Sequence, residues 1–219
     1  MTEITDYINN DIKGLDISET IAGVQDFFAE LSFTHFPVLE NGIYVGSISS
    51  DDVETFDSEK TIADYRYTLE GFYVRNTMIW LDVFEVFARN HASVVPVLDE
   101  ANVYKGYYDI TDIVKFFHET PFLKELGGIL IVQKPVADYS MGQVAQIVES
   151  NNGKILGMFV SNVENGLAQI TVKVTLGSLN EIIQTFRRYN YEIVSEHQED
   201  NYLNALKERS DYLDRYLNI

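Results

Sequence analysis

The chain has 219 residues, of which 46% are hydrophobic and 23% are charged, a composition typical of a globular protein with one large domain or two smaller ones. Its net charge of −18 argues against binding to nucleic acid or to anionic membranes, because Lys and Arg side chains provide most of the affinity for both. The absence of cysteine excludes disulfides, thiolate metal ligands and a cysteine nucleophile, and no apolar run approaches the ~20 residues that span a bilayer.

The first predicted elements are a helix, a β-hairpin and the start of a second helix. Ser18-Glu19-Thr20 is typical of a helix N-terminus, and apolar residues follow at helical spacing, namely Ile21, Val24, Phe27, Phe28 and Leu31. Strands are predicted over 36–39 and 43–48, joined by a tight turn at Glu40-Asn41-Gly42. We expect the second helix to begin between residues 49 and 52.

The same order of elements is predicted again further along the chain. A helix begins at about Ile79, and strands over 94–98 and 103–108 flank a turn. A helix over 111–118 follows the second of these strands. Alternating helices and strands predict a mixed α/β fold.

These two stretches are a sequence repeat of about 60 residues. Pro37 and Pro96 are 59 residues apart, whereas Gly46 and Gly106 are 60 apart, as are the aspartates at 52 and 112. The stretch 4–7 also matches 62–65 at a step of 58. Two copies are too few for a solenoid, so we predict two modules, 1–60 and 61–120, that pack on each other and form two equivalent clefts where they meet.

The chain changes character after Pro121. Residues 126–197 have the predicted order β-α-β-β-α-β of a ferredoxin-like domain, with a strong hairpin signal at Asn165-Gly166. Residues 199–219 have leucines at helical spacing and are predicted to form an amphipathic helix. That helix is expected to pack on its own domain or on a partner subunit.

The repeated motifs resemble a known signature. Gly46-Ser47-Ile48-Ser49-Ser50-Asp51-Asp52, and its counterpart from Gly106 to Asp112, are similar to the cystathionine-β-synthase (CBS) motif, in which an apolar-Pro-Val strand precedes Gly-x-x-Ser/Thr-x-x-Asp. Residues 126–197 resemble an ACT domain in element order and in Asp138, Gly142 and Gly153. A CBS pair followed by an ACT domain is the arrangement of acetoin-utilisation-type bacterial regulatory proteins.

The CBS resemblance implies a ligand-sensing protein that binds an adenosyl compound such as AMP, ATP or S-adenosylmethionine. It implies that Ser49 and Asp52 form one site and Asp109 and Asp112 the other, with each motif aspartate binding the ribose hydroxyls. Asp109 departs from the motif, because Ser or Thr is expected there, and its carboxylate would repel a phosphate. We therefore expect a nucleotide to favour the first site, and the second to take a neutral or cationic adenosyl compound or no ligand.

The ACT resemblance implies a separate ligand site outside the CBS pair, in the loop that contains Asp138 and Gly142. Asp138 would contact the amine of an amino acid; as an alternative, it is a turn or helix-capping residue. The acidic run Asp51, Asp52 and Glu54 suits Mg²⁺ chemically, but carboxylates at a helix start are the simpler interpretation, so no metal site is predicted.

No nucleophile motif, phosphate loop or His-x-x-x-His spacing occurs, so we predict a regulatory protein that is not an enzyme and has no catalytic residues. A homodimer is expected, together with a regulated protein that the sequence does not identify. The alternative is a scaffold that binds only a partner protein and whose clefts are degenerate. The sequence has no signal-peptide pattern, so a cytoplasmic location is expected.

Overall fold

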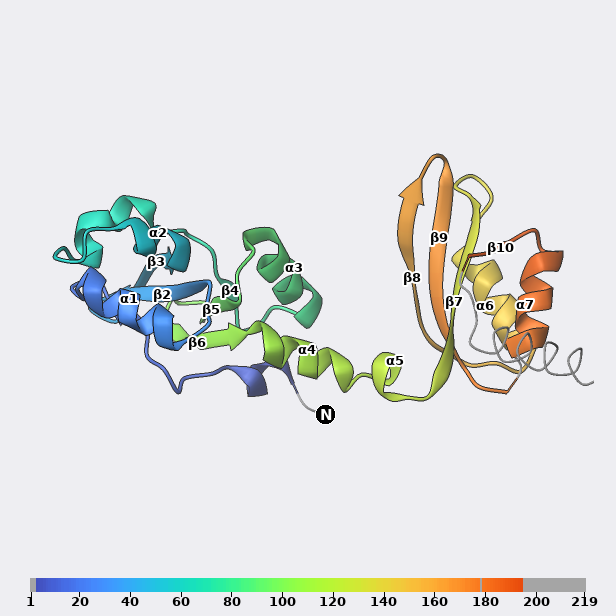
Figure 1. The fold of residues 1–219 in the computed structure, drawn as a ribbon. Helices are drawn as coiled ribbons and strands as arrows, with labels where there is room; N and C mark the ends of the chain where they lie inside the picture. Colours follow the sequence, from blue (N-terminus) through green and yellow to red (C-terminus); the bar gives the residue numbers. More distant parts are fainter. Residues whose placement is uncertain (1–2, 178, 195–219) are drawn as a thin grey trace, which may run out of the picture. The chain divides into compact units, whose positions relative to one another are not determined.

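The computed structural model describes residues 3–177 and 179–194, and the chain divides into two compact units between Phe117 and His118 (Figure 1). Each unit has its own buried core. The predicted helix over 199–219 and the last residues of the predicted 126–197 domain lie outside the described residues.

The first module of unit 1 is a three-stranded sheet with two helices. Its elements are η1 (Ile4–Tyr7), β1 (Leu15–Asp16), α1 (Ile21–Glu30), β2 (His35–Glu40), β3 (Ile43–Ser49) and α2 (Ser50–Thr55). The strand order is β1-β2-β3, with β1 parallel and β3 antiparallel to the central strand. Asn41 and Gly42, at φ 52° and 80°, form the predicted turn, since both central residues of this hairpin turn need positive φ.

The second module repeats this topology. Its elements are η2 (Ile62–Thr68), β4 (Val74–Arg75), α3 (Trp80–Asn90), β5 (Val94–Leu98), β6 (Tyr104–Asp109) and α4 (Ile110–His118). The strand order is β4-β5-β6, and Val74 pairs with Val97 as Leu15 pairs with Val38 in the first module. The predicted mixed α/β class is therefore confirmed.

The two modules exchange their N-terminal segments, which precede the first strand of each sheet. Asn9, before β1 of the first module, pairs with Tyr107 on β6 of the second, through N–H···O bonds of 2.8 and 3.0 Å. Glu70, before β4 of the second module, pairs with Ser47 on β3 of the first, through two bonds of 2.8 Å. The 3₁₀ turns of the two segments also match, because Asp6 accepts the Glu3 N–H and Asp64 accepts the Thr61 N–H, each at 3.0 Å.

The repeated motif glycines allow these segments to approach. Gly46 and Gly106 have φ of 148° and 136°, a conformation that other residues rarely adopt. A Cβ at Gly106 would lie 2.3 Å from the Asn9 carbonyl oxygen, and one at Gly46 would lie 2.8 Å from the Leu69 Cβ. Glycine is therefore required at both positions by the backbone and by the neighbouring segment.

Unit 2 is a four-stranded antiparallel sheet with the predicted β-α-β-β-α-β order. Its elements are α5 (Pro121–Lys124), β7 (Gly127–Pro135), α6 (Met141–Ser150), β8 (Ile155–Glu164), β9 (Leu167–Thr175), α7 (Leu179–Arg188) and β10 (Glu192–Ile193). The strand order is β10-β7-β9-β8. Helices α6 and α7 cover one face (Figure 1), where Leu130, Ile147 and Phe186 belong to one buried core. On the other face, the Phe122 ring of α5 lies over Gly157 and Lys173.

Gly153 and Gly142, both part of the ACT resemblance, have opposite surroundings, which gives a first prediction. A Cβ at Gly153 would lie 2.8 Å from Ile182 Cδ1, whereas one at Gly142 would meet only the Ser140 hydroxyl, at 3.6 Å. We expect Gly153→Ala to destabilise the protein by about 1–3 kcal/mol through overpacking. Gly142→Ala, in the first turn of α6, should instead leave stability unchanged or raise it by up to about 1 kcal/mol. Thermal unfolding of the two variants checks this, and equal effects would contradict it.

Candidate functional site

The two modules meet at a reciprocal pair of hydrogen bonds. The Thr34 N–H donates to Ser93 Oγ at 2.9 Å, and the Ser93 N–H donates to Thr34 Oγ1 at 2.8 Å. These residues are 59 positions apart, the step that relates the two central strands, β2 and β5, which lie against each other. A bond that is returned by the equivalent residue indicates a local pseudo-twofold relation between the modules.

The helices that follow the two motifs are hydrogen-bonded to this pair of residues. The Ser50 N–H donates to the Thr34 carbonyl at 2.8 Å, and the Ile110 N–H donates to the Ser93 carbonyl at 2.9 Å. Helices α2 and α4 therefore start at equivalent places beside the seam, by which we mean the contact of β2 with β5 at Thr34 and Ser93. The structure places the first predicted pair of site residues at the start of α2 and the second at the start of α4.

At the first motif, the Ser49 hydroxyl and the Asp52 carboxylate have no partner in the described chain. Ser49 is the N-cap residue of α2, but its hydroxyl accepts no capping hydrogen bond. No hydrogen bond or ion pair joins the carboxylate of Asp52 to any of residues 3–177 and 179–194, and the residue is partly buried. The nearby Thr55 hydroxyl donates to the Asp52 backbone carbonyl, at 2.8 Å, and not to its carboxylate. A hydroxyl and a carboxylate therefore remain available one helical turn apart.

At the second motif both carboxylates are engaged. Asp109 Oδ1 accepts from the Thr111 N–H at 2.7 Å and from the Thr111 hydroxyl at 2.5 Å. Lys115 Nζ lies 2.8 Å from Asp112 Oδ1, and this hydrogen bond raises the pKa of Lys115 above its usual value. The two motifs thus differ in whether their side chains already have hydrogen-bond partners.

Tyr107 adds an aromatic ring beside the second motif. It occupies the position of Ser47 in the first module, is almost fully buried, and packs its ring 5.2 Å from that of Phe36. Burial raises the pKa of Tyr107, and the negative charges of Asp11, Asp109 and Asp112 raise it further. Its hydroxyl therefore lies in a region of negative potential.

The same exchange of serine for tyrosine leaves another hydroxyl unpaired. In the first module, the buried Tyr44 hydroxyl donates to the Phe72 carbonyl at 2.7 Å and lies 3.1 Å from Ser47 Oγ, and burial raises the pKa of Tyr44 to about 12. The equivalent Tyr104 hydroxyl is buried without a partner among the described residues. The modules therefore share a backbone but not a polar network.

Three other basic residues, His35, Lys105 and His91, have different surroundings. His35 is buried, with Nε2 3.2 Å from Glu70 Oε1 and Nδ1 3.0 Å from Thr34 Oγ1. Lys105 forms an ion pair with Asp99 at 2.9 Å. His91 is exposed and ends α3 in the left-handed conformation, at φ 50°.

Sequence reasoning missed Thr34 and Ser93. A signal was present, because a small hydroxyl residue stands directly before each repeated strand at the same 59-residue step. It is easily overlooked, since neither residue belongs to the Gly-x-x-Ser/Thr-x-x-Asp motif.

In unit 2, Asp138 and Gly142 flank the start of α6. The Asp138 N–H donates to the Pro135 carbonyl at 2.9 Å, which places this exposed residue in a turn. Ser140, and not Asp138, is the N-cap, because its hydroxyl accepts from the Gln143 N–H. The Asp138 carboxylate has no hydrogen-bond partner within the described ranges.

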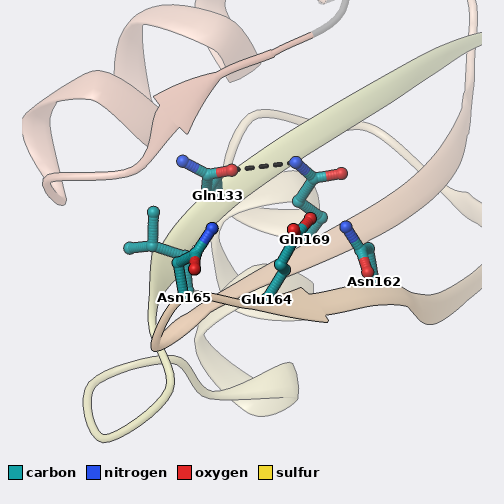
Figure 2. A pocket seen from close by; sticks show the side chains of 6 residues that line it. Gln133, Asn162, Glu164, Asn165 and Gln169 are labelled. Atoms are coloured by element: carbon teal, nitrogen blue, oxygen red, sulfur yellow. Dashed lines mark hydrogen bonds between the residues drawn. The ribbon is translucent and has the colours of Figure 1, made fainter.

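A small hollow of about 100 Å³ lies at the same end of the sheet (Figure 2). It is lined by Gln133, Asn162, Glu164, Asn165, Leu167 and Gln169. The Gln169 amide donates to the Gln133 amide oxygen at 2.9 Å, on the sheet face opposite α6 and α7. Asp138 and Gly142 are not part of its lining, so the hollow is distinct from the predicted ACT-type site.

The described part of the chain contains neither a grouped set of metal ligands nor a helix that could span a membrane. Among residues 3–177 and 179–194, no three His, Cys, Asp or Glu side chains are grouped so that they would hold a metal ion. None of the helices in that part of the chain combines the length and apolarity that crossing a membrane requires.

Comparisons with known proteins give remote similarities. No family model matches the chain. A curated relative, the uncharacterized protein MJ0188 of Methanocaldococcus jannaschii, is 23% identical over 133 residues, which are 60% of this chain and 50% of that protein. The chain thus matches about half the length of that relative.

Several solved structures of CBS-domain proteins are similar to the chain. A CBS domain pair/ACT domain protein of Thermotoga maritima matches with a TM-score of 0.48 and 17% identity, over 54% of this chain and 98% of that chain. The CBS domains of a Streptococcus pneumoniae transcriptional regulator match with a TM-score of 0.46 and 16% identity, over 52% and 98%. CBSX2 in complex with AMP matches with a TM-score of 0.45 and 17% identity, over 53% and 96%.

Proposed function

We propose that this chain is a regulatory protein without catalytic activity, which binds an adenosyl-containing small molecule at Ser49 and Asp52. The proposal treats modules 1–60 and 61–120 as a CBS pair and residues 126–197 as an ACT-like domain. In cells the protein would be cytoplasmic and homodimeric, and would act on a protein partner. Ligand binding shifts such a protein between states only by the difference in its affinity for them.

The observation that carries this proposal is the unpaired hydroxyl and carboxylate at the first motif. Asp52 is partly buried beside the seam, without a counter-ion in the described chain. A carboxylate with free lone pairs accepts hydrogen bonds from two neighbouring hydroxyls, such as those of a ribose. A buried or partly buried polar group without a partner is costly, so a ligand that supplies two donors gains affinity there.

Calorimetric titration of the whole protein with AMP, ATP and S-adenosylmethionine tests the proposal. We expect at least one to bind, and Asp52→Ala to weaken it by at least ~10-fold, because hydrogen bonds to a charged acceptor contribute about 1.5–3 kcal/mol. Thr55→Ser, which keeps the neighbouring hydroxyl, is the matched control and should bind normally. Absence of binding by all three compounds would reject the adenosyl ligand.

A second candidate function is a scaffold that binds a protein partner and no nucleotide. The engaged carboxylates of the second motif favour it, since a ligand there would have to compete with Thr111 and Lys115. An amino-acid ligand at Asp138 and Gly142 is also compatible with the adenosyl proposal, because the exposed Asp138 carboxylate is unpaired in the described chain. Thermal-shift screening across the amino acids separates this last possibility from the others.

A further inference from the structure

We propose that the two motif sites are unequal, and that Thr111 and Lys115 occupy the polar groups of the second, so that each chain binds one adenosyl ligand and binds it at the first motif. This inference rests on the function proposed above and adds to it the number of ligands and the residues that set that number.

A comparison of equivalent positions shows how the difference arises. At a step of 60, Ser49 corresponds to Asp109, Asp51 to Thr111, and Thr55 to Lys115, while the motif aspartate itself is retained. The two motifs start from the same backbone hydrogen bonds, those of residues 50 and 110. They differ at further positions, such as 47 and 107, but these three exchanges decide which side chains pair with the motif residues.

The first difference replaces the unpaired Ser49 hydroxyl with the Asp109 carboxylate, which accepts a hydrogen bond from the first turn of its helix. Asp109 accepts both the backbone N–H and the hydroxyl of Thr111, at 2.7 and 2.5 Å. Asp51, which replaces Thr111 in the first module, has no hydroxyl to donate, and Ser49 makes no capping bond. A ligand at the second motif would have to break the two bonds to Asp109 and also place any phosphate beside its negative charge.

The second difference supplies the retained aspartate with an internal cation. Lys115 reaches Asp112 at 2.8 Å, with Asp112 24% exposed, whereas the Thr55 hydroxyl at the equivalent place bonds only to a backbone carbonyl. A ribose hydroxyl at Asp112 would have to displace the Lys115 ammonium, so that a hydrogen bond with one charged partner would replace one in which both partners are charged. Because the Lys115 side chain is exposed to solvent, the ion pair is weak. It therefore lowers the affinity of the second motif for a ligand but does not block binding completely.

The test exchanges the three residues between the motifs and counts bound nucleotide. Equilibrium dialysis with labelled AMP on the whole protein should give one AMP per chain. The triple substitution Asp109→Ser, Thr111→Asp and Lys115→Thr should raise this to two. The reverse exchange, Ser49→Asp, Asp51→Thr and Thr55→Lys, should abolish binding. Lys115→Thr alone, the mildest change, should allow a second AMP to bind with lower affinity than the first. This variant also tests the inference if the triple variant fails to fold.

The outcomes separate this inference from the function on which it rests. Two AMP molecules per wild-type chain, or one AMP that survives the reverse exchange, would overturn the inequality and leave nucleotide binding intact. A folded triple variant that still binds one AMP, with Lys115→Thr also unchanged, would likewise overturn it. If neither the wild type nor any folded variant binds AMP, ATP or S-adenosylmethionine, the proposed function fails and the inference fails with it.

Discussion

Replacement of Gly106 with alanine is expected to destabilise unit 1 by about 3 kcal/mol, because two independent costs act at one residue. The backbone at Gly106 has φ 136°, and an added Cβ would lie 2.3 Å from the Asn9 carbonyl oxygen. That oxygen belongs to the segment whose backbone pairs with Tyr107, so it cannot move aside without breaking this bridge. Urea unfolding followed by fluorescence of Trp80, the single tryptophan, measures the loss.

Gly42→Ala is the matched control for this substitution. Gly42 also has a positive φ, 80°, but nothing lies within 4 Å of the position its Cβ would take. It should therefore show only the backbone cost, about 1 kcal/mol. If the two variants unfolded at the same urea concentration, close approach of the preceding segment would not be the reason for a glycine at position 106.

Phe36→Ala should destabilise unit 1 by about 3–5 kcal/mol, the range for removing a buried aromatic side chain. Phe36 is fully buried, and its ring centroid lies 4.7 Å from that of Phe27, 5.4 Å from that of Phe33 and 5.2 Å from that of Tyr107. Since Tyr107 comes from the second module, the cavity would open where the modules join. The same Trp80 unfolding experiment reads the effect.

Phe36→Leu separates loss of volume from loss of aromatic contacts. It keeps most of the buried apolar volume, so we expect a cost of about 1–2 kcal/mol. A Phe36→Ala variant that unfolded within about 1 kcal/mol of the wild type would show that the core collapses to fill the space, contrary to a closely packed joint.

The elements with strong local signals were predictable from the sequence. Asn41-Gly42 and Asn165-Gly166 supply the positive φ values that two-residue hairpin turns need, so both hairpins follow from short-range chemistry. The 59- and 60-residue steps identify the repeat without any knowledge of its contacts.

What the sequence left out depends on contacts between distant residues. Strands β1 and β4 have two residues each, too few to show an alternating pattern, and form only because a longer strand lies beside them. The helical turn α5 was likewise not expected after Pro121; Phe122 within it lies over Gly157, 35 positions away. The bonds between Thr34 and Ser93 depend on how two copies meet, which neither copy's sequence specifies alone.

The positions of the candidate site residues in the fold could be predicted from the sequence, but the partners of their side chains could not. The motif placed Ser49, Asp52, Asp109 and Asp112 beside the starts of two equivalent helices, as the structure has them. Whether each group is free depends on side-chain partners. Lys115 was not considered in the prediction, although its spacing from Asp112, three positions along a helix, is one at which opposite charges commonly pair.

Because the two modules exchange their N-terminal segments, the chain cannot be cut between them into two complete sheets. Cutting the chain between its two sequence copies would give each fragment the edge segment that belongs to the other's sheet, Asn9 for the first and Glu70 for the second. The unit that repeats in the sequence is therefore not a unit that completes itself in space. Each module therefore depends on the other to cover an edge of its sheet, and removal of either one would expose that edge in the module that remained.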